Sequence, residues 1–285
     1  ERIPQVETIV HNVNSKRTNV ILGPKNHILY GDGTITDHIK DLQFTLSPHS
    51  FFQVNPEQTT VLYDQALTYA DLKGDETVID AYCGTGTISL FLAHKAKHVI
   101  GIEIVEPAII NARENARRNG YDNTEFIVAD AAVEMPKLYK AGVRPDVIVF
   151  DPIRAGCKEE VLTSAAGMEP KRIVYVSCNP ATMARDIEIL THYGYELQEV
   201  QPVDMFPMTA HVETVALLSK LNVDKHIDVE IKLNEFDLTS AESKATYAKI
   251  KEYILEKFGL KVPTLYIAQI KKKCGIELRR SEEHT

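Results

Sequence analysis

A cysteine follows a run of apolar and β-branched residues in the segment Ser177-Cys178-Asn179-Pro180. Asn179 and Pro180 disfavour continuation of a strand, so the sulfur is expected at a strand end. A thiolate in such a place is a nucleophile able to form a covalent intermediate. The commoner fate of a lone cysteine is an inert buried position. Both interpretations of Cys178 are open on this segment alone.

Two glycines in the segment Asp80–Thr87 follow an earlier apolar run and precede an expected helix. Glycine allows a sharp turn and the close approach of a ligand, and Gly84 stands at the turn. Ser89 occupies the position where a dinucleotide fingerprint G-x-G-x-x-G needs its third glycine. The turn therefore suits a cofactor without a pyrophosphate, such as S-adenosylmethionine.

Two acids end the next two apolar runs. Glu103 lies 103 − 84 = 19 positions after Gly84, close to the ~20 expected of a carboxylate that accepts hydrogen bonds from ribose hydroxyls. Asp130 ends the following run, where a carboxylate can accept a hydrogen bond from an adenine amine. This order is typical of S-adenosylmethionine enzymes. The alternative is that both acids only cap helices.

The elements that would position these residues alternate between strands and helices from Thr77 onward. Such alternation predicts an α/β fold with a doubly wound, Rossmann-like, mostly parallel sheet. The last two strands have only a loop between them, so the last strand is expected to be antiparallel. The predicted strands are Thr77–Ala81, His98–Ile104, Glu125–Ala129, Asp146–Phe150, Arg172–Ser177, Tyr195–Val203 and Val212–Leu218, and the predicted helices are Pro56–Leu72, Ile88–His94, Pro107–Asn119, Lys158–Gly167 and Thr182–Tyr193.

The two ends of the chain differ from this pattern. Short β-rich runs at Glu7–Val10, Asn19–Leu22, His27–Tyr30 and Gln43–Leu46 predict a small antiparallel β element. After Leu221 the composition predicts a helical tail with helices near Asp237–Phe258 and Val262–Lys273. We expect three parts: a β-rich element over residues 1–50, an S-adenosylmethionine-dependent α/β domain over 51–221 and a helical extension over 222–285.

Composition indicates a globular protein of the cytoplasm. No apolar run approaches the ~20 residues needed to cross a bilayer, and four cysteines in 285 residues do not form a disulfide framework. No metal site and no protein partner are expected. The formal net charge of −8 argues against a nucleic-acid partner, although a basic cleft can lie on an acidic protein.

Five ordered blocks resemble the RNA uracil-5 methyltransferases that act on 23S ribosomal RNA or on the T-loop of tRNA. They span about residues 1–220, which makes the resemblance specific. The blocks are Ser50–Asn55, Asp80–Gly86, Asp151–Cys157, Ser177–Pro180, and Asp204–Pro207 together with His211–Glu213.

The resemblance implies S-adenosylmethionine as cofactor and RNA as partner, with 23S ribosomal RNA preferred and tRNA the second choice. It implies Cys178 as the nucleophile that adds to C6 of uracil and Glu213 as the base that removes the C5 proton. Asp151 would orient the uracil and the amino-acid end of the cofactor. Gln53 and Tyr82 would contact the cofactor.

The chain departs from the family pattern in several places. Ile153 stands where relatives carry a second proline, and Met208 stands where many carry glutamine. Relatives also carry an N-terminal RNA-binding barrel, and many carry an iron–sulfur cluster, neither of which this sequence contains. The chain starts at Glu1 without a methionine, so we expect a fragment, with any cluster in the missing region.

Two other functions are open. An enzyme that methylates an exocyclic amine of a base needs no cysteine, but often carries an aromatic residue where Arg154 stands. A non-catalytic RNA-binding protein on the same scaffold is the second, although the presence of Cys178, Glu213 and Asp151 argues against it.

Overall fold

A seven-stranded sheet forms the centre of the protein. The computed structural model describes residues 3, 5–15, 17 and 21–221, so the predicted helices of the tail lie outside the described residues. The strand order is β10-β11-β9-β8-β5-β6-β7. Their bounds are β5 Thr77–Asp80, β6 His98–Glu103, β7 Thr124–Val128, β8 Val147–Phe150, β9 Arg172–Ser177, β10 Tyr195–Val203 and β11 Glu213–Lys220.

The strands from β5 to β9 pair in parallel, and β11 pairs antiparallel with both β9 and β10. The chain runs from β5 to β6 and β7 on one side, then returns to β8 and β9 on the other side. Ligands bind at such a reversal of strand order in doubly wound sheets. The predicted fold class, including the antiparallel last strand, is confirmed.

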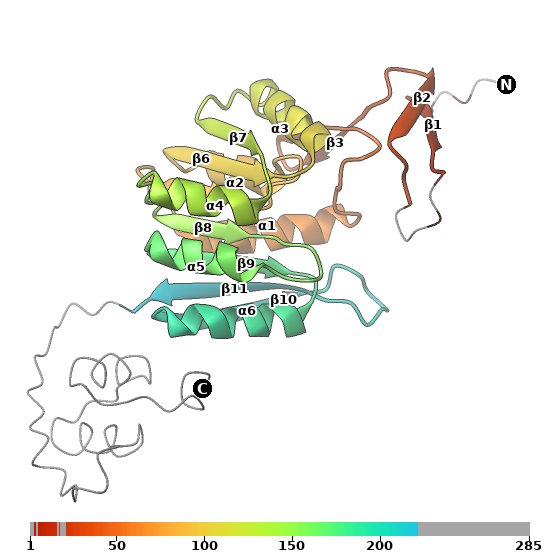
Figure 1. Ribbon diagram of the computed structural model, residues 1–285. Coiled ribbons are helices and arrows are strands. Elements are labelled where there is room, and N and C mark those ends of the chain that lie inside the picture. Colours follow the sequence, from red (N-terminus) through yellow and green to blue (C-terminus); the bar gives the residue numbers. More distant parts are fainter. Residues whose placement is uncertain (1–2, 4, 16, 18–20, 222–285) are drawn as a thin grey trace, which may run out of the picture. The chain divides into compact units, whose positions relative to one another are not determined.

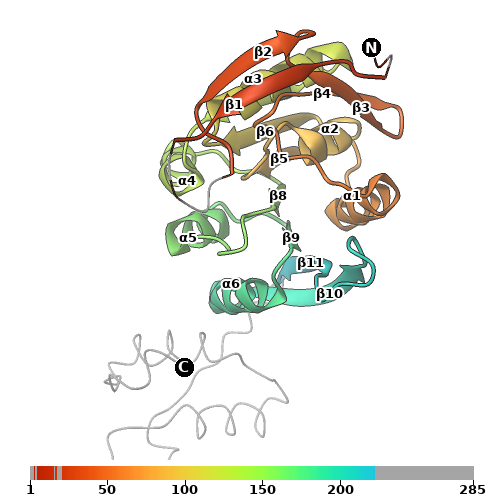
Figure 2. The same cartoon turned by 90° about the vertical axis from the view of Figure 1, so that its right-hand side faces the viewer.

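Three helices cover each face of the sheet, as Figure 1 and Figure 2 show in two views. Leu62, Phe91 and Ile109 of α1 to α3 are buried with one set of strand side chains, and Met135, Leu162 and Ile187 of α4 to α6 are buried with the other set. The bounds are α1 Pro56–Ala70, α2 Thr87–Ala93, α3 Glu106–Arg118, α4 Ala131–Lys140, α5 Glu159–Gly167 and α6 Pro180–His192.

Helix starts follow from local sequence. Asn55 caps α1 by accepting from the Gln58 N–H at 3.2 Å, with Pro56 in the first turn. Asp130 caps α4 in the same way through Ala132. The predicted helices do not include α4, because Pro136 interrupts its helical pattern.

Two small antiparallel pairs precede the sheet: β1 (Ile9–Val13) with β2 (Lys25–Tyr30), and β3 (Ile35–Ile39) with β4 (Leu42–Leu46). The small antiparallel element is therefore present. The expected strand at Asn19–Leu22 is wrong for its described residues Ile21 and Leu22, and β3 was not expected. No helix among the described residues is long and apolar enough to cross a membrane.

Asn115 of α3 joins the small β element to the glycine turn. This side chain is fully buried. Its carbonyl oxygen accepts from the Thr45 N–H of β4 at 2.7 Å, and its amide donates to the Thr85 carbonyl at 3.1 Å. One side chain therefore satisfies two backbone groups on segments 40 residues apart in sequence, since 85 − 45 = 40.

Asn115→Ala is expected to lower the free energy of unfolding by roughly 2–4 kcal/mol, because it leaves two buried backbone groups without partners. Urea unfolding followed by circular dichroism measures this loss. Arg117→Ala, an exposed change on the same helix, is the control and should cost under about 0.5 kcal/mol. Equal effects of the two changes would contradict the connecting role of Asn115.

Candidate active site

The carboxyl ends of the parallel strands lie at one edge of the sheet, on the right of Figure 1. Parallel strands end at a common edge, so residues that follow different strands come together there. Tyr82 and Gly84 follow β5, Glu103 ends β6, Asp130 follows β7, Asp151 follows β8 and Cys178 follows β9.

The antiparallel β11 brings Glu213 to the same edge. In the register of the two strands, Thr214 of β11 lies opposite Ser177 of β9. Glu213 precedes Thr214 and Cys178 follows Ser177, so both residues lie at the same end of the pair. A strand that runs against its neighbours thus adds a carboxylate to a site otherwise built from strand ends.

Cys178 lies in a bend directly after β9. The Ser177 hydroxyl accepts from the Asn179 N–H at 3.0 Å, which fixes the backbone around the thiol. The side chain is half-buried and carries a free thiol. Burial and the neighbouring Glu213 raise the pKa of this thiol, and Arg154, which lies within hydrogen-bonding reach of the sulfur, opposes that rise.

The other two described cysteines differ from Cys178 in exposure. Cys83 is 4% exposed and Cys157 is 6% exposed. Burial raises the pKa of both thiols, which makes thiolate formation costly. Within the described part of the chain, Cys178 is therefore the thiol best placed to react with a ligand.

Three carboxyl groups with raised pKa values lie at this edge of the sheet. Glu213 is 5% exposed, and burial raises its pKa to about 7 against the effect of Arg154. Burial and the charges of Glu213 and Asp80 raise the pKa of Asp151 well above its ordinary range. Asp80 is fully buried, accepts from the Ser89 hydroxyl at 2.6 Å and has its pKa raised by burial to about 6. Such a group can exchange protons near neutral pH.

Tyr63 of α1 also belongs to this cluster, although the sequence analysis does not identify it. Its ring is 3% exposed, and its hydroxyl lies 3.1 Å from that of Thr87. Burial and the charge of Asp151 raise the pKa of the Tyr63 hydroxyl. No motif indicates this residue; only its place on the inner face of α1 could have suggested it.

The loop after β8 carries the family departure at position 153. The Ile153 side chain is 77% exposed, whereas Asp151 is half-buried and Arg154 is exposed. The Arg154 carbonyl accepts from the Asn179 side chain at 3.1 Å. This contact fixes the loop beside Cys178 without a second proline.

The turn after β5 leaves room for a ligand. Gly84 has a φ of +53°, and a Cβ at this residue would meet no atom within 4 Å. Tyr82 lies half-buried after the same strand, and its hydroxyl is within hydrogen-bonding reach of Cys157. The Oγ1 of Thr85 and the Oδ1 of Asp80 are buried without a hydrogen-bond partner in the described residues. This turn thus has open space and unused polar capacity.

Glu103 and Asp130 lie at neighbouring strand ends. Glu103 is half-buried, and its Oε1 accepts from the Val105 N–H at 2.9 Å. Asp130 accepts from Ala132 and pairs with Lys158 at 2.8 Å, and the hydrogen bond from Lys158 lowers its pKa. The N-cap interpretation of Asp130 is thus correct as far as its local contacts go. A carboxylate has lone pairs for further donors.

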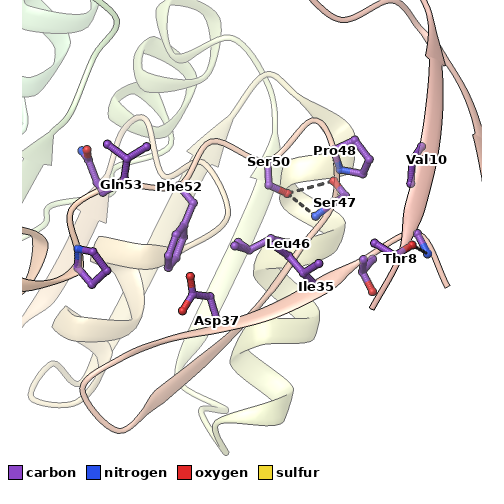
Figure 3. A pocket seen from close by; sticks show the side chains of 14 residues that line it. Thr8, Val10, Ile35, Asp37, Leu46, Ser47, Pro48, Ser50, Phe52 and Gln53 are labelled. Atoms are coloured by element: carbon purple, nitrogen blue, oxygen red, sulfur yellow. Dashed lines mark hydrogen bonds between the residues drawn. The ribbon is translucent and has the colours of Figure 1, made fainter. Parts of the chain in front are cut away.

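Gln53 lies on the loop between β4 and α1 and is 7% exposed. It lies at one end of a hollow of about 540 Å³ between this loop and the small β element, shown in Figure 3. Asn55 on the same loop donates to the Met205 carbonyl at 3.2 Å, which joins the loop to the β10–β11 connection. The hollow itself lies beside Gln53 and does not include Cys178.

Comparison with known proteins identifies relatives over most of the chain. The family model described as tRNA (uracil-5-)-methyltransferase matches residues 25–221. An uncharacterized RNA methyltransferase of Halalkalibacterium halodurans is 60% identical over 220 residues, which are 77% of this chain and 48% of that protein. A protein of the same description from Clostridium acetobutylicum is 55% identical over 220 residues, again 77% and 48% of the two chains. The chain thus spans about half the length of these curated relatives.

Solved structures give the same picture. A Pyrococcus abyssi tRNA (uracil-54, C5)-methyltransferase, solved with S-adenosyl-L-homocysteine, has a TM-score of 0.62 and 33% identity, covering 74% of this chain and 50% of that one. The Trm5b protein of Pyrococcus abyssi has a TM-score of 0.54 at 17% identity, covering 75% and 64% of the two chains, which shows a common fold.

Glu213→Gln should stabilise the protein increasingly as pH rises. The unfolded chain loses the Glu213 proton near its ordinary pKa of 4.5, whereas the folded protein holds it until about 7. The wild type therefore loses stability between these values, and the variant does not. The difference in unfolding free energy should grow by up to roughly 3 kcal/mol over this window and stay constant above it.

Urea unfolding of both proteins at pH 5, 6, 7 and 8 measures this difference. Glu160→Gln, an exposed change on α5, is the control and should alter stability by less than about 0.5 kcal/mol at each pH. Parallel stability curves for the wild type and Glu213→Gln would show that Glu213 is not a buried carboxyl with a raised pKa.

Proposed function

The chain belongs to the tRNA (uracil-5-)-methyltransferase family, and from this we propose that it transfers a methyl group from S-adenosylmethionine to C5 of a uracil in RNA. The observation that carries the proposal is the meeting of Cys178 and Glu213 at one end of the β9–β11 pair. Methylation at C5 needs both a nucleophile and a base, because uracil C5 attacks a methyl group only after addition at C6. Methylation of an exocyclic amine needs no such nucleophile.

The strand-end acids support S-adenosylmethionine as the cofactor. Glu103 and Asp130 are spaced to accept hydrogen bonds from ribose hydroxyls and an adenine amine, and the open space over Gly84 leaves room for the nucleoside. Gln53, Tyr82 and Asp151 are the further contacts proposed for this group. When bound, S-adenosylmethionine supplies an electrophilic methyl group on a positively charged sulfur. A Pyrococcus relative was solved with the demethylated product of this cofactor.

In the proposed first step, Cys178 loses its proton to water and its sulfur forms a bond to C6 of the uracil. The electron pair of the C5–C6 double bond moves onto the O4 enolate, and C5 becomes the nucleophile that takes the methyl group. Asp151, with a pKa raised by burial, is proposed to hold the uracil edge by a hydrogen bond. The base must leave its stack to reach this edge of the sheet.

In the proposed second step, Glu213 accepts the proton from C5. The electrons of the C5–H bond restore the C5–C6 double bond, and Cys178 leaves as a thiolate. A base works best when its pKa lies near the working pH, and burial raises the pKa of Glu213 to about 7. The product is 5-methyluridine. Glu213 then releases its proton to water and the Cys178 thiolate takes one up from water, which returns both protein groups to their starting states.

Ribosomal RNA, specifically 23S, is the substrate we propose. The T-loop of tRNA is the second candidate, favoured by the description of the matched family and by the tRNA enzyme among the solved structures. RNA specificity depends on the shape of loops and their contacts, which shared catalytic motifs do not decide. We propose residues 51–221 as the catalytic domain, with residues 1–50 as the β element beside it and residues 222–285 as an extension.

Removing either strand-end acid should weaken cofactor binding. Glu103→Gln and Asp130→Asn keep the size of each side chain but lose a charged acceptor, which is worth about 1.5–3 kcal/mol. Calorimetric titration with S-adenosyl-L-homocysteine should show an affinity roughly 10- to 100-fold lower for each. Glu106→Gln, in the first turn of α3, is the control and should bind as the wild type does. Unchanged affinity in both test variants would place the cofactor elsewhere.

RNA that carries 5-fluorouridine should trap the chain covalently. Fluorine at C5 cannot leave as a proton, so the adduct formed with S-adenosylmethionine should persist as a shifted band on a denaturing gel. Cys178→Ala should abolish the band. Cys157→Ala, which alters a buried thiol, is the matched control and should retain it. Glu213→Gln should accumulate the adduct even with unmodified RNA, because its amide accepts no proton.

The choice of transcript separates the two RNA candidates. Fragments of 23S ribosomal RNA and a tRNA T-loop are tested in parallel, and the proposal expects the stronger band with ribosomal RNA. Suppose that the protein binds the cofactor and methylates RNA but forms no covalent band, and that the Cys178→Ala variant stays active. C5 methylation would then be rejected in favour of amine methylation.

A further inference from the structure

The loop that carries Arg154 is fastened to the segment that follows Cys178. The Arg154 carbonyl accepts from the side chains of Asn179 at 3.1 Å and Thr182 at 3.2 Å. The next carbonyl, of Ala155, accepts from Arg185 at 2.9 Å. These two segments are therefore not free to move apart, and hydrogen bonds to backbone carbonyls hold Arg154 beside the segment that follows Cys178.

Buried hydrogen bonds hold the C-terminal end of the same loop. The Cys157 N–H donates to Asp186 at 2.7 Å, and the Tyr175 hydroxyl donates to the same oxygen at 2.6 Å. Asp186 is fully buried and pairs with Arg185 at 2.7 Å. This network anchors the end of the loop in the core, so the loop around Arg154 is braced at both sides.

The loop contacts hold Arg154 next to the segment of Cys178, and the register of β9 and β11 places Glu213 at the same end of that pair. The charge of Arg154 lowers the pKa of the Cys178 thiol and that of Glu213. Among the charged groups that shift the pKa values of Cys178 and Glu213, Arg154 is the cation and the others are acids. Other nearby cations of the described chain have their own partners, Lys158 with Asp130 and Arg185 with Asp186.

The remaining ionisable groups around the pair are acids. Asp151 acts on Cys178 from the β8 loop, and Tyr63 of α1 lies near both Asp151 and Glu213. A thiolate and a carboxylate side by side repel each other, and each is costly to bury alone. A positive charge that acts on both groups favours whichever of the two is ionised at a given moment.

We propose that Arg154 is a positioning residue that presents one guanidinium first to the Cys178 thiolate and then to the Glu213 carboxylate. The second half of this statement depends on the proposed function. Once the sulfur is bonded to C6 it is an uncharged thioether and no longer needs the cation, which is then available to the Glu213 carboxylate before that group takes the C5 proton. When Cys178 leaves again as a thiolate, Glu213 has become neutral.

The test uses the free protein, without RNA or cofactor. Iodoacetamide alkylates thiolates, and mass spectrometry of the Cys178 peptide gives the alkylation rate at each pH for this residue alone. Arg154→Gln should shift the midpoint of the rate profile upward by about one pH unit, because a cation near a thiol lowers its pKa by an amount of this order. Below the midpoint the variant should react roughly tenfold more slowly.

Three further variants give the test its controls. Glu213→Gln removes the opposing charge and should move the midpoint downward. Arg154→Lys keeps the charge and should recover part of the shift. Arg118→Gln, an exposed change on α3, should leave the profile unchanged. A profile in Arg154→Gln identical to that of the wild type would overturn the proposal.

A contact between Arg154 and an RNA phosphate predicts a different result. If Arg154 instead contacts a phosphate, Arg154→Gln should raise the dissociation constant for RNA and leave the alkylation profile unchanged, which counts against our proposal. The alkylation test does not involve RNA, so its outcome is separate from that of the fluorouridine trap. A shifted profile with no trapped adduct would support the effect of Arg154 on the thiol while rejecting the proposed function.

Discussion

The antiparallel pairing of β11 with β9 is the constraint on which the candidate site depends. A purely parallel sheet brings together residues that end or follow strands, and it brings Cys178, Asp151, Glu103 and Asp130 to one edge in this way. It does not bring the first residue of a strand to that edge. Because β11 runs the other way, Glu213 begins its strand where Cys178 has just ended another.

The electrostatic character of the site follows from this arrangement. Burial raises the pKa values of Asp80, Asp151 and Glu213, and the charges of Glu213 and Asp80 raise that of Asp151 further. Such a cluster costs stability, since buried carboxyl groups resist ionisation. The charge of Arg154, on the loop after β8, opposes this effect at Glu213. Ionisable groups with raised pKa values at one place are common at functional sites.

The fold and most of the candidate site could be predicted from the sequence, because both depend on order along the chain. Strand–helix alternation determines a parallel sheet, and a parallel sheet determines which strand ends meet. Contacts made by unremarkable residues were not predictable. Tyr63 carries no motif, and α4 was missed because Pro136 interrupts its pattern. The two hydrogen bonds of Asn115 join segments that sequence periodicity treats as independent.

Those two hydrogen bonds of Asn115 also limit how this protein can be recombined with its relatives. A crossover placed between the small β element and the sheet would look harmless, because few chain connections pass there. It would nevertheless separate the Thr45 N–H from Asn115 of α3, whose side-chain oxygen accepts its hydrogen bond. The amide of the same Asn115 donates to the Thr85 carbonyl in the glycine turn. A chimera that exchanges the β element therefore has to exchange α3 as well, so the two elements must be transferred together.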